Sequence, residues 1–362
     1  MISADATFIE DENGKIVTYG DMISETARLA HLLVKEGVRP GDRVAVQVEK
    51  SPEALLLYLA CLRSGAVYLP LNTAYTPVEV EYFINDSDPT LVVVDPSKHE
   101  AISPIALVNG AKIATLGLNR TGSLMVACDQ QSEHFDDVDR LNDDLAAILY
   151  TSGTTGRSKG AMLTHGNLLS NALTLKEVWE YTSSDKLIHA LPIFHTHGLF
   201  VATNLTLLSG ASMHFLQKFD IDKVIALMDR SSVMMGVPTY YTRLIADQRL
   251  TRDATASMRL FISGSAPLLA ETHRIFTAKT GHAILERYGM TETNMITSNP
   301  YDGDRVAGTV GFALPGVDVR VVDSDTGKVV LPSEPGMIEV RGPNVFTGYW
   351  KMPEKTKEEF RP

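Results

Sequence analysis

Cysteine is scarce in this chain: its 362 residues include only two, Cys61 and Cys128. No Cys-x-x-Cys pair accompanies them, and no pair of histidines has the spacing of a zinc site, so neither a disulfide scaffold nor a zinc centre is expected. So few thiols are typical of a protein kept in a reducing compartment. We therefore expect a cytoplasmic protein.

Positive charge is also in short supply. Lysine and arginine total 33 against 44 aspartates and glutamates, which gives a formal net charge of −11. This balance argues against a surface for nucleic acid or for an anionic membrane. We expect no nucleic-acid partner, and any phosphate site must be built locally.

Long apolar runs are missing as well. The most apolar window, residues 54–71, is interrupted by Arg63, Ser64 and Gly65, so it is too short and too polar to cross a bilayer. The N-terminal residues 1–6 lack the basic-then-apolar order of a signal peptide. We expect no membrane partner.

What the chain does contain is a regular alternation of strand and helix patterns. Ser51 and Pro52 predict the start of a helix that ends at Gly65, and Pro77 starts another. Buried strands are predicted at residues 43–48, 66–69, 91–94, 147–150, 187–190, 211–215, 233–237, 260–263 and 284–287. Such alternation with short turns indicates an α/β fold with mostly parallel sheets.

The pattern divides the chain into three parts. We expect a first α/β subdomain at residues 1–145, ending in a linker at about 119–144, and a second at 146–315 that begins with the strand before a glycine-rich loop. After Pro315, β-branched runs at 317–322 and 337–340 between Gly- and Pro-rich turns predict a small antiparallel β unit, residues 316–362.

The glycine-rich loop, residues 149–160, has the composition of a phosphate cradle. Gly153, Gly156 and Gly160 allow close backbone approach, five hydroxyl residues supply donors, and Lys159 supplies positive charge. Its spacing is not that of a Walker loop. We expect bound phosphate, without the fold of the P-loop NTPases.

Three further polar stretches lie near predicted strand ends: residues 192–198, 263–267 and 286–293. Glu292 lies in a hydroxyl-rich loop, and a carboxylate facing a phosphate cradle is typical of a Mg²⁺ ligand, although a solvated loop carboxylate is the alternative. Residues 263–267 also fit a simple strand-to-helix turn. His195 and His197 share a loop whose i, i+2 spacing does not favour a metal; placing a carboxylate substrate suits them better.

Residues 151–160, 288–292 and 348–350, in this order, resemble the signature motifs of the acyl-adenylate-forming superfamily, which contains acyl-CoA synthetases, peptide-synthetase adenylation domains and luciferases. The resemblance covers nearly the whole chain. Residues 191–199, 260–268 and 285–294 resemble, more narrowly, the malonyl-CoA synthetase family. Its members make malonyl-CoA from malonate, ATP and CoA through a malonyl-adenylate and often accept methylmalonate.

The resemblance implies the large domain of an acyl-CoA synthetase, two α/β subdomains with a partial β-barrel, and the cofactors ATP, Mg²⁺ and CoA. It implies that Thr151 and Glu292 hold Mg²⁺ and that both, with His195, take part in catalysis; His195, Ser263 and Arg287 would contact the acid. The residues implied to contact the nucleotide are Thr151, Ser152, Gly153, Thr154, Thr155, Gly156, Lys159, Ser263, Gly264, Ser265, Ala266, Glu286, Tyr288, Gly289, Met290 and Thr291.

Arg287 is our candidate for choosing the acid. Malonate has a second carboxylate that needs a cation once it leaves water, and a guanidinium can meet it with two parallel hydrogen bonds. A monocarboxylic acid would leave the guanidinium unpaired. The alternative is an arginine held in a surface ion pair.

Members of this superfamily continue with an aspartate for the ribose, a hinge and a small domain that carries a catalytic lysine and half of the CoA site. None of these follows Pro362, so we expect an impaired N-terminal part that forms the nucleotide and malonate pockets. The alternatives are a ligase for another carboxylic acid and a non-catalytic nucleotide-binding protein. The sequence does not predict the oligomeric state.

Overall fold

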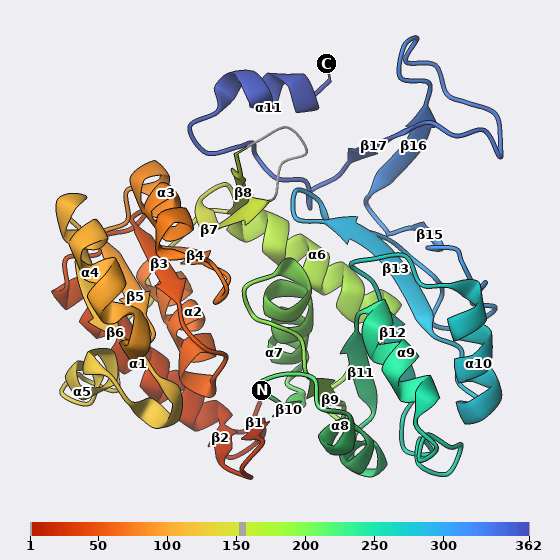
Figure 1. Cartoon of the computed structure of the whole chain (residues 1–362), viewed down its shortest axis with the longest axis horizontal. Helices are drawn as coiled ribbons and strands as arrows, with labels where there is room; N and C mark the ends of the chain where they lie inside the picture. Colours follow the sequence, from red (N-terminus) through yellow and green to blue (C-terminus); the bar gives the residue numbers. More distant parts are fainter. Residues whose placement is uncertain (1, 152–156, 362) are drawn as a thin grey trace.

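The computed structural model describes residues 2–151 and 157–361. Two sheets, each covered by helices, stand side by side, with a smaller unit above them (Figure 1). The first sheet has the strand order β6-β5-β3-β4-β7-β8, and only the β7–β8 pair is antiparallel. Its strands are β3 Arg43–Gln47, β4 Val67–Pro70, β5 Leu91–Val94, β6 Lys112–Thr115, β7 Leu145–Thr151 and β8 Lys159–Thr164.

Helices lie on both faces of this sheet because its strands are apolar on both sides. Val44 and Val46 of β3 join one core with the helices α1 and α2, whereas Ala45 faces a second core with α3 and α4. The helices are α1 Tyr19–Lys35, α2 Pro52–Ser64, α3 Pro77–Ser87, α4 His99–Val108 and α5 Ser123–Cys128. The predicted ends of α2 are confirmed: the Ser51 hydroxyl caps it, and Gly65 ends it in a left-handed conformation.

The second sheet has the order β15-β14-β13-β12-β11-β9-β10-β1-β2 and is parallel from β13 to β1. Its strands are β1 Thr7–Asp11, β2 Ile16–Thr18, β9 Lys186–His189, β10 Ser212–Phe215, β11 Val233–Gly236, β12 Leu260–Ser263, β13 Leu285–Met290, β14 Asn294–Ser298 and β15 Phe312–Ala313. Its helices are α6 His165–Val178, a π-helix at His197–Asn204, α7 Leu205–Ser209, α8 Ile221–Leu227, α9 Pro238–Ala246 and α10 Ala270–Thr280.

One continuous core joins the two sheets. Apolar side chains of α1 and α2 pack in the same buried cluster as those of α6 and α7, so these helices form a shared central layer. A separate core packs α8, α9 and α10 on the far face of the second sheet. The predicted α/β class with mostly parallel sheets is therefore confirmed.

The sheets do not follow the boundary predicted at residues 145 and 146. Strands β7 and β8 complete the first sheet, so the prediction that β7 opens the second layer is wrong. Strands β1 and β2, near the N-terminus, instead pair at the edge of the second sheet. Short-range sequence patterns predict where strands lie but not which strands pair. The partners depend on contacts between residues far apart in the chain. The division into three domains stays a prediction.

One local prediction also needs correction. The segment predicted as a linker contains α5, whose Leu124, Met125 and Cys128 are buried. The glycine-rich loop itself connects the antiparallel strands β7 and β8.

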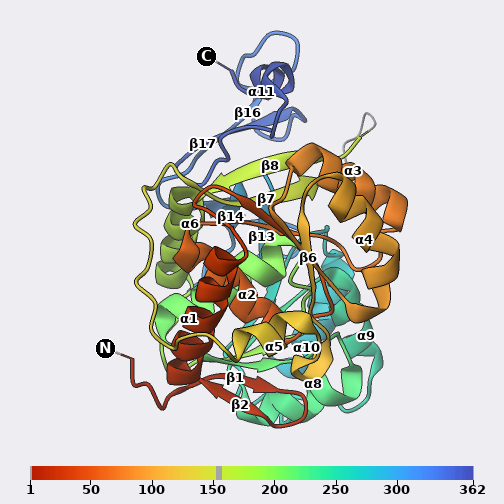
Figure 2. The ribbon, with the colours of Figure 1, turned by 90° about the vertical axis from the view of Figure 1, so that its left-hand side faces the viewer.

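The third unit contains an antiparallel pair, β16 Asp318–Val322 and β17 Met337–Arg341, which confirms the predicted β pairing. It projects above the two sheets (Figure 2). Residues 346–350 then return to β8, where the Met162 amide donates to the Gly348 carbonyl at 3.0 Å and the Trp350 amide to Gly160 at 2.8 Å. Helix α11, Pro353–Glu359, follows.

Both cysteines are buried and free. Within residues 2–151 and 157–361, none of the helices is long and apolar enough to cross a bilayer.

The buried Asp185 joins the starts of three strands of the second sheet, because Asp185, Ser232 and Arg259 directly precede β9, β11 and β12. Asp185, 3% exposed, accepts hydrogen bonds from Arg259 Nε and Nη2, both at 2.7 Å, from Ser232 Oγ at 2.7 Å and from the Thr182 amide at 2.8 Å. Burial alone would raise the pKa of Asp185, but the bonds from Arg259, Thr182 and Ser232 lower it overall. The carboxylate is therefore ionised in the folded protein at neutral pH.

We predict that Asp185→Asn lowers the free energy of unfolding by about 2 to 4 kcal/mol, because it leaves the Arg259 guanidinium without its counter-charge. The folded pKa lies below the unfolded value of about 3.9. The variant should therefore show the full loss of stability above a pH of about 3.9. The difference from the unaltered protein should shrink as the pH falls through the folded pKa of Asp185. Urea unfolding at several pH values measures it.

The matched control is Asp318→Asn, which removes an ion pair with Arg341 between side chains 71% and 87% exposed. It should change stability by less than about 0.5 kcal/mol. Equal losses in the two variants would contradict the role given to Asp185.

Candidate functional site

The glycine-rich loop joins the two antiparallel strands β7 and β8. Ser152, Gly153, Thr154, Thr155 and Gly156, predicted to contact phosphate, lie outside the described residues. Thr151 and Lys159 are directly opposite each other where the strands meet the loop, and the Thr151 hydroxyl donates to the Lys159 carbonyl at 3.4 Å. The structure thus brings these two predicted residues together.

Lys159 contacts two groups from the C-terminal part of the chain. Its ammonium nitrogen lies 4.4 Å from the centre of the Tyr349 ring and 3.6 Å from Glu359 Oε1 of α11. The Lys159 side chain is 15% exposed, whereas that of Glu359 is 42% exposed. An anion of higher charge could therefore replace Glu359 at little cost.

Glu292 is buried, and its Oε1 accepts a hydrogen bond from the Tyr349 hydroxyl at 2.9 Å. None of the described lysines, arginines or histidines forms an ion pair with it. Its neighbour Thr291 is half-buried and Met290 is exposed. Burial of an ionised carboxylate without a cation costs free energy, so Glu292 suits a group that brings positive charge.

Magnesium fits this donor set. No cluster of three or more His, Cys, Asp or Glu side chains able to hold a metal exists among the described residues. Mg²⁺ differs from zinc in needing no such cage, since it binds through one or two protein oxygens together with water and substrate phosphates. The Glu292 carboxylate and the Thr151 hydroxyl are oxygen donors of this kind.

Arg287 lies on β13, 3% exposed, with its guanidinium directly over the backbone of Gly264. A Cβ atom at Gly264 would lie 2.6 Å from Arg287 Nε, so any larger residue there would displace the guanidinium from this place. Nε and Nη2 of Arg287 are both buried and without a hydrogen-bond partner among the described residues. These two nitrogens form the side of the guanidinium that meets a carboxylate with two parallel bonds.

The alternative of a surface ion pair for Arg287 is wrong, since the side chain is buried and no described carboxylate lies within 4 Å. Burial lowers the pKa of Arg287 to about 9, although nearby Tyr241 acts to raise it. A buried cation without a partner is costly, and an anionic ligand would remove that cost.

The loop that carries His195 and His197, called the histidine loop below, lies near Arg287. His197 is 4% exposed, its Nδ1 lies 3.3 Å from Ser265 Oγ, and its Nε2 has no partner in the described part of the chain. Burial, together with the charge of Arg287, keeps the pKa of His197 well below its usual range, so the ring is neutral at pH 7. The sequence suggested a carboxylate-placing role for His197 together with His195, and that role stays a prediction.

His195 lies at the surface two residues earlier, its ring 4.6 Å from that of Phe194. Desolvation by the surrounding protein lowers the pKa of His195, while the side chain keeps access to solvent. Its predicted place in the acyl site stays a prediction.

The remaining predicted residues follow the ends of β12 and β13. Ser263 and Gly264 are buried, and Ser263 Oγ has no partner among the described residues; Ser265 and Ala266 are exposed. Ser265 has a left-handed backbone with φ 70°, a strained conformation that accompanies its contact with His197. These residues therefore lead from the buried guanidinium to the surface.

The carboxylate of Glu286 on β13 is bonded to another part of the protein backbone: its Oε1 accepts a hydrogen bond from the Gly308 amide at 3.1 Å. Burial raises the pKa of Glu286. Tyr288 and Gly289 are half-buried. The predicted contacts of these three residues with a nucleotide base stay predictions.

Sequence reasoning missed a buried lysine that supports the histidine loop. Lys50 follows β3 of the first sheet, and its Nζ donates to Nδ1 of His189 at 2.9 Å and to the His189 carbonyl at 2.8 Å. His189 Nε2 lies 2.9 Å from the Gly198 carbonyl and, as the protonated nitrogen, donates to it. Burial lowers the pKa of both Lys50 and His189. This chain of bonds ties the first sheet to the loop that carries His197.

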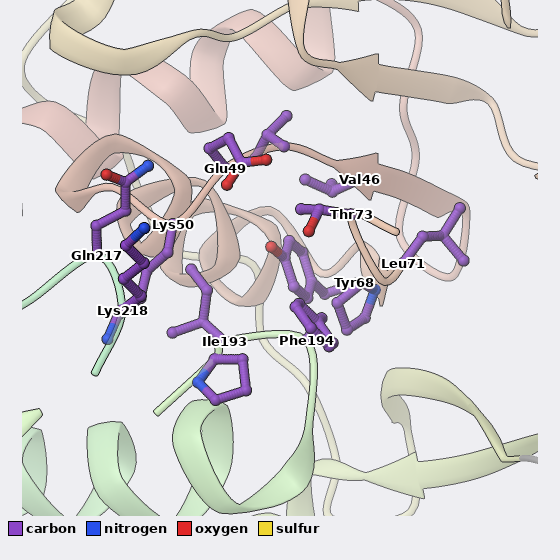
Figure 3. Close-up of a pocket in the computed structure, with 13 residues that line it drawn as sticks. Val46, Glu49, Lys50, Tyr68, Leu71, Thr73, Ile193, Phe194, Gln217 and Lys218 are labelled. Atoms are coloured by element: carbon purple, nitrogen blue, oxygen red, sulfur yellow. The ribbon is translucent and has the colours of Figure 1, made fainter. Parts of the chain in front are cut away.

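A cavity of about 200 Å³ opens next to this contact, between the carboxyl ends of β3 and β4 and the segments that follow β9 and β10. Figure 3 shows side chains from both sheets gathered around it. Its lining includes Lys50, Tyr68, Thr73, Phe194 and Lys218. No local sequence pattern predicts this cavity, because its walls come from segments far apart in the chain.

Comparisons with known proteins agree with this arrangement. A family model described as AMP-binding enzyme matches residues 3–350. The malonate–CoA ligase of Arabidopsis thaliana is 36% identical over 386 residues, covering 96% of this chain and 63% of that protein. The chain thus spans about three fifths of the length of the curated relatives it matches.

Among solved structures, ATP-bound MatB from Rhodopseudomonas palustris is 61% identical with a TM-score of 0.98, covering all of this chain and 72% of that one. A malonyl-CoA ligase in a ternary product complex with methylmalonyl-CoA and AMP is 32% identical with a TM-score of 0.84, covering 99% and 73%. The resemblance seen in the three sequence motifs is therefore confirmed. The chain belongs to the AMP-binding enzyme family.

Proposed function

We propose that this chain is the large part of an ATP-dependent acid–thiol ligase that activates malonate, and also methylmalonate, as an acyl-adenylate and transfers it to CoA. The observation that carries the proposal is the buried Arg287 guanidinium, whose Nε and Nη2 have no partner among the described residues. A dicarboxylic acid can place one carboxylate there and leave the other free to react. The similarity to malonate–CoA ligases supports the same substrate.

Activation is needed because a carboxylate is a poor electrophile. In the first step a malonate carboxylate attacks the α-phosphate of ATP, forming the acyl–phosphate bond as pyrophosphate leaves. The CoA thiolate then attacks the acyl carbon, and AMP leaves. Most of the catalysis in the first step is positioning and charge neutralisation.

Each part of the site has a share in this chemistry. Residues 151–160 would hold the β- and γ-phosphates, with Lys159 as the cation, and Thr151 and Glu292 would hold Mg²⁺. The metal, when bound, neutralises phosphate charge. Arg287 would bind the remote carboxylate, while His197 and Ser265 line the way to it and His195 borders the acyl site.

CoA is proposed as the second substrate, and the curated relatives are longer than the part matched here. The two free cysteines support a reducing, cytoplasmic location.

The rival proposals are a ligase for another carboxylic acid and a nucleotide-binding protein without catalysis. A ligase for a monocarboxylic acid would leave Arg287 buried and unpaired, which is costly. A nucleotide sensor would bind ATP with no mutual effect of malonate, whereas an enzyme pocket should bind both together. Calorimetry with ATP and malonate, added in either order, separates these cases.

We predict that Arg287→Ala weakens malonate binding at least about a hundredfold, because two charge-assisted hydrogen bonds at roughly 1.5 to 3 kcal/mol each are lost. ATP affinity should stay unchanged. Arg287→Lys should recover only part of the loss, since an ammonium lacks the two-nitrogen edge. Isothermal calorimetry with a non-hydrolysable ATP analogue and Mg²⁺ present measures both affinities.

The charge control is Arg274→Ala on α10, where the side chain is 68% exposed and, within the described residues, pairs only with Glu271. It should leave both affinities as they are. Malonate binding to Arg287→Ala with wild-type affinity would overturn the substrate assignment.

The lowered pKa of Arg287, about 9, gives malonate binding a pH dependence. Below that pH the guanidinium is charged; above it, binding must take up a proton, since the ligand stabilises the charged form. We predict constant affinity from pH 7 to 8 and a fall approaching tenfold per pH unit above 9. Calorimetry in buffers of different ionisation enthalpy should reveal the proton uptake, and unchanged affinity at pH 10 would contradict it.

A further inference from the structure

Glu292 and Lys159 carry opposite charges near the proposed phosphate site, yet no direct ion pair within 4 Å joins them among the described residues. What lies between them is Tyr349, the middle residue of the Gly348–Trp350 motif. Its side chain is 4% exposed and contacts both groups. The sequence singles out this motif, and the proposed function gives it no role.

The backbone fixes Tyr349 from both sides. The Phe346 amide donates to the Glu292 carbonyl at 2.7 Å, which ties the segment to the loop after β13. The Met162 and Trp350 amides bond across to Gly348 and Gly160, which adds the same segment to the edge of β8. Lys159 is on β8 of the first sheet, whereas Glu292 lies in the turn between β13 and β14 of the second sheet. Residues 346–350 are therefore a bridge between the two halves of the site.

The hydroxyl and the ring face of Tyr349 make different contacts. The hydroxyl donates to Glu292 Oε1 at 2.9 Å, which fixes the carboxylate and occupies one of its two oxygens. The face of the ring accepts the Lys159 ammonium at 4.4 Å from its centre.

We propose that Tyr349 is a positioning residue that holds the Glu292 carboxylate and the Lys159 ammonium apart, so that one can meet Mg²⁺ and the other the polyphosphate of ATP. Without the ring, the two charges would be free to neutralise each other in a direct ion pair. ATP and its metal would then have to break that pair before binding. The inference rests on the proposed function, because it assumes a site for ATP with Mg²⁺.

Two substitutions separate the two contacts. Tyr349→Phe keeps the ring but removes the hydroxyl, so it should raise the Mg²⁺ concentration needed for half-maximal ATP affinity by about tenfold. ATP affinity in EDTA should not change. Tyr349→Ala also removes the spacer, so ATP affinity in EDTA should fall by a similar factor as Lys159 pairs with Glu292. Calorimetric titration of ATP at graded Mg²⁺ measures both quantities.

A double variant tests the ion pair directly. In Tyr349→Ala with Glu292→Gln, Lys159 has lost its new partner, and ATP affinity in EDTA should return to the wild-type value. A merely structural role for Tyr349 predicts no such rescue. Phe346→Leu is the packing control: Phe346 lies 4.9 Å from Tyr349 between ring centres, so this change should lower the melting temperature without shifting the Mg²⁺ dependence.

The outcomes separate this inference from the proposed function. Wild-type Mg²⁺ dependence in Tyr349→Phe, or no rescue in the double variant, overturns the role of Tyr349 and leaves the ligase proposal standing. If the unaltered chain binds ATP with Mg²⁺ but ignores malonate, the substrate proposal fails and the role of Tyr349 stands. If the unaltered chain binds no ATP even with Mg²⁺, both are overturned.

Discussion

The proposed site depends on one unfavourable feature, a buried guanidinium that has no counter-ion among the described residues. Arg287 is held over the bare backbone of Gly264, where any side chain at that position would displace it. The fold accepts the cost of this desolvated charge, which is visible in the lowered pKa of Arg287. An anionic ligand would offset this desolvation cost, and His197 Nε2 and Ser263 Oγ also have no partner in the part of the chain that the structure describes.

The rest of the structure places this charge and Lys159, the cation proposed to bind phosphate, in different sheets. Lys159 belongs to the first sheet and Arg287 to the second, and two sets of contacts cross between the sheets. Tyr349 ties β8 to the Glu292 loop, and Lys50 ties β3 to the histidine loop. The central helical layer fixes the spacing of the two sheets. Ligand positioning is thus a property of the junction between them.

Local patterns were enough to predict most strands, the ends of α2 and the α/β class, because burial periodicity and capping act over a few residues. They could not place β7 or β1 in the correct sheet, since strand partners are chosen across the whole chain. The site shows the same limit: Arg287 and Glu292 were evident from their motifs, whereas Lys50 matters only through its contact with His189. His197 was named from its loop, but its contact with Ser265 and its place near Arg287 could be seen only in the folded chain.

The central claim is that the buried guanidinium selects a dicarboxylic acid. Calorimetry of malonate against acetate, on the unaltered chain with Mg²⁺ and a non-hydrolysable ATP analogue, tests it most directly. We expect malonate to bind at least about a hundredfold more tightly than acetate, because acetate cannot both reach the reacting position and pair with Arg287. Equal affinities for the two acids would contradict it.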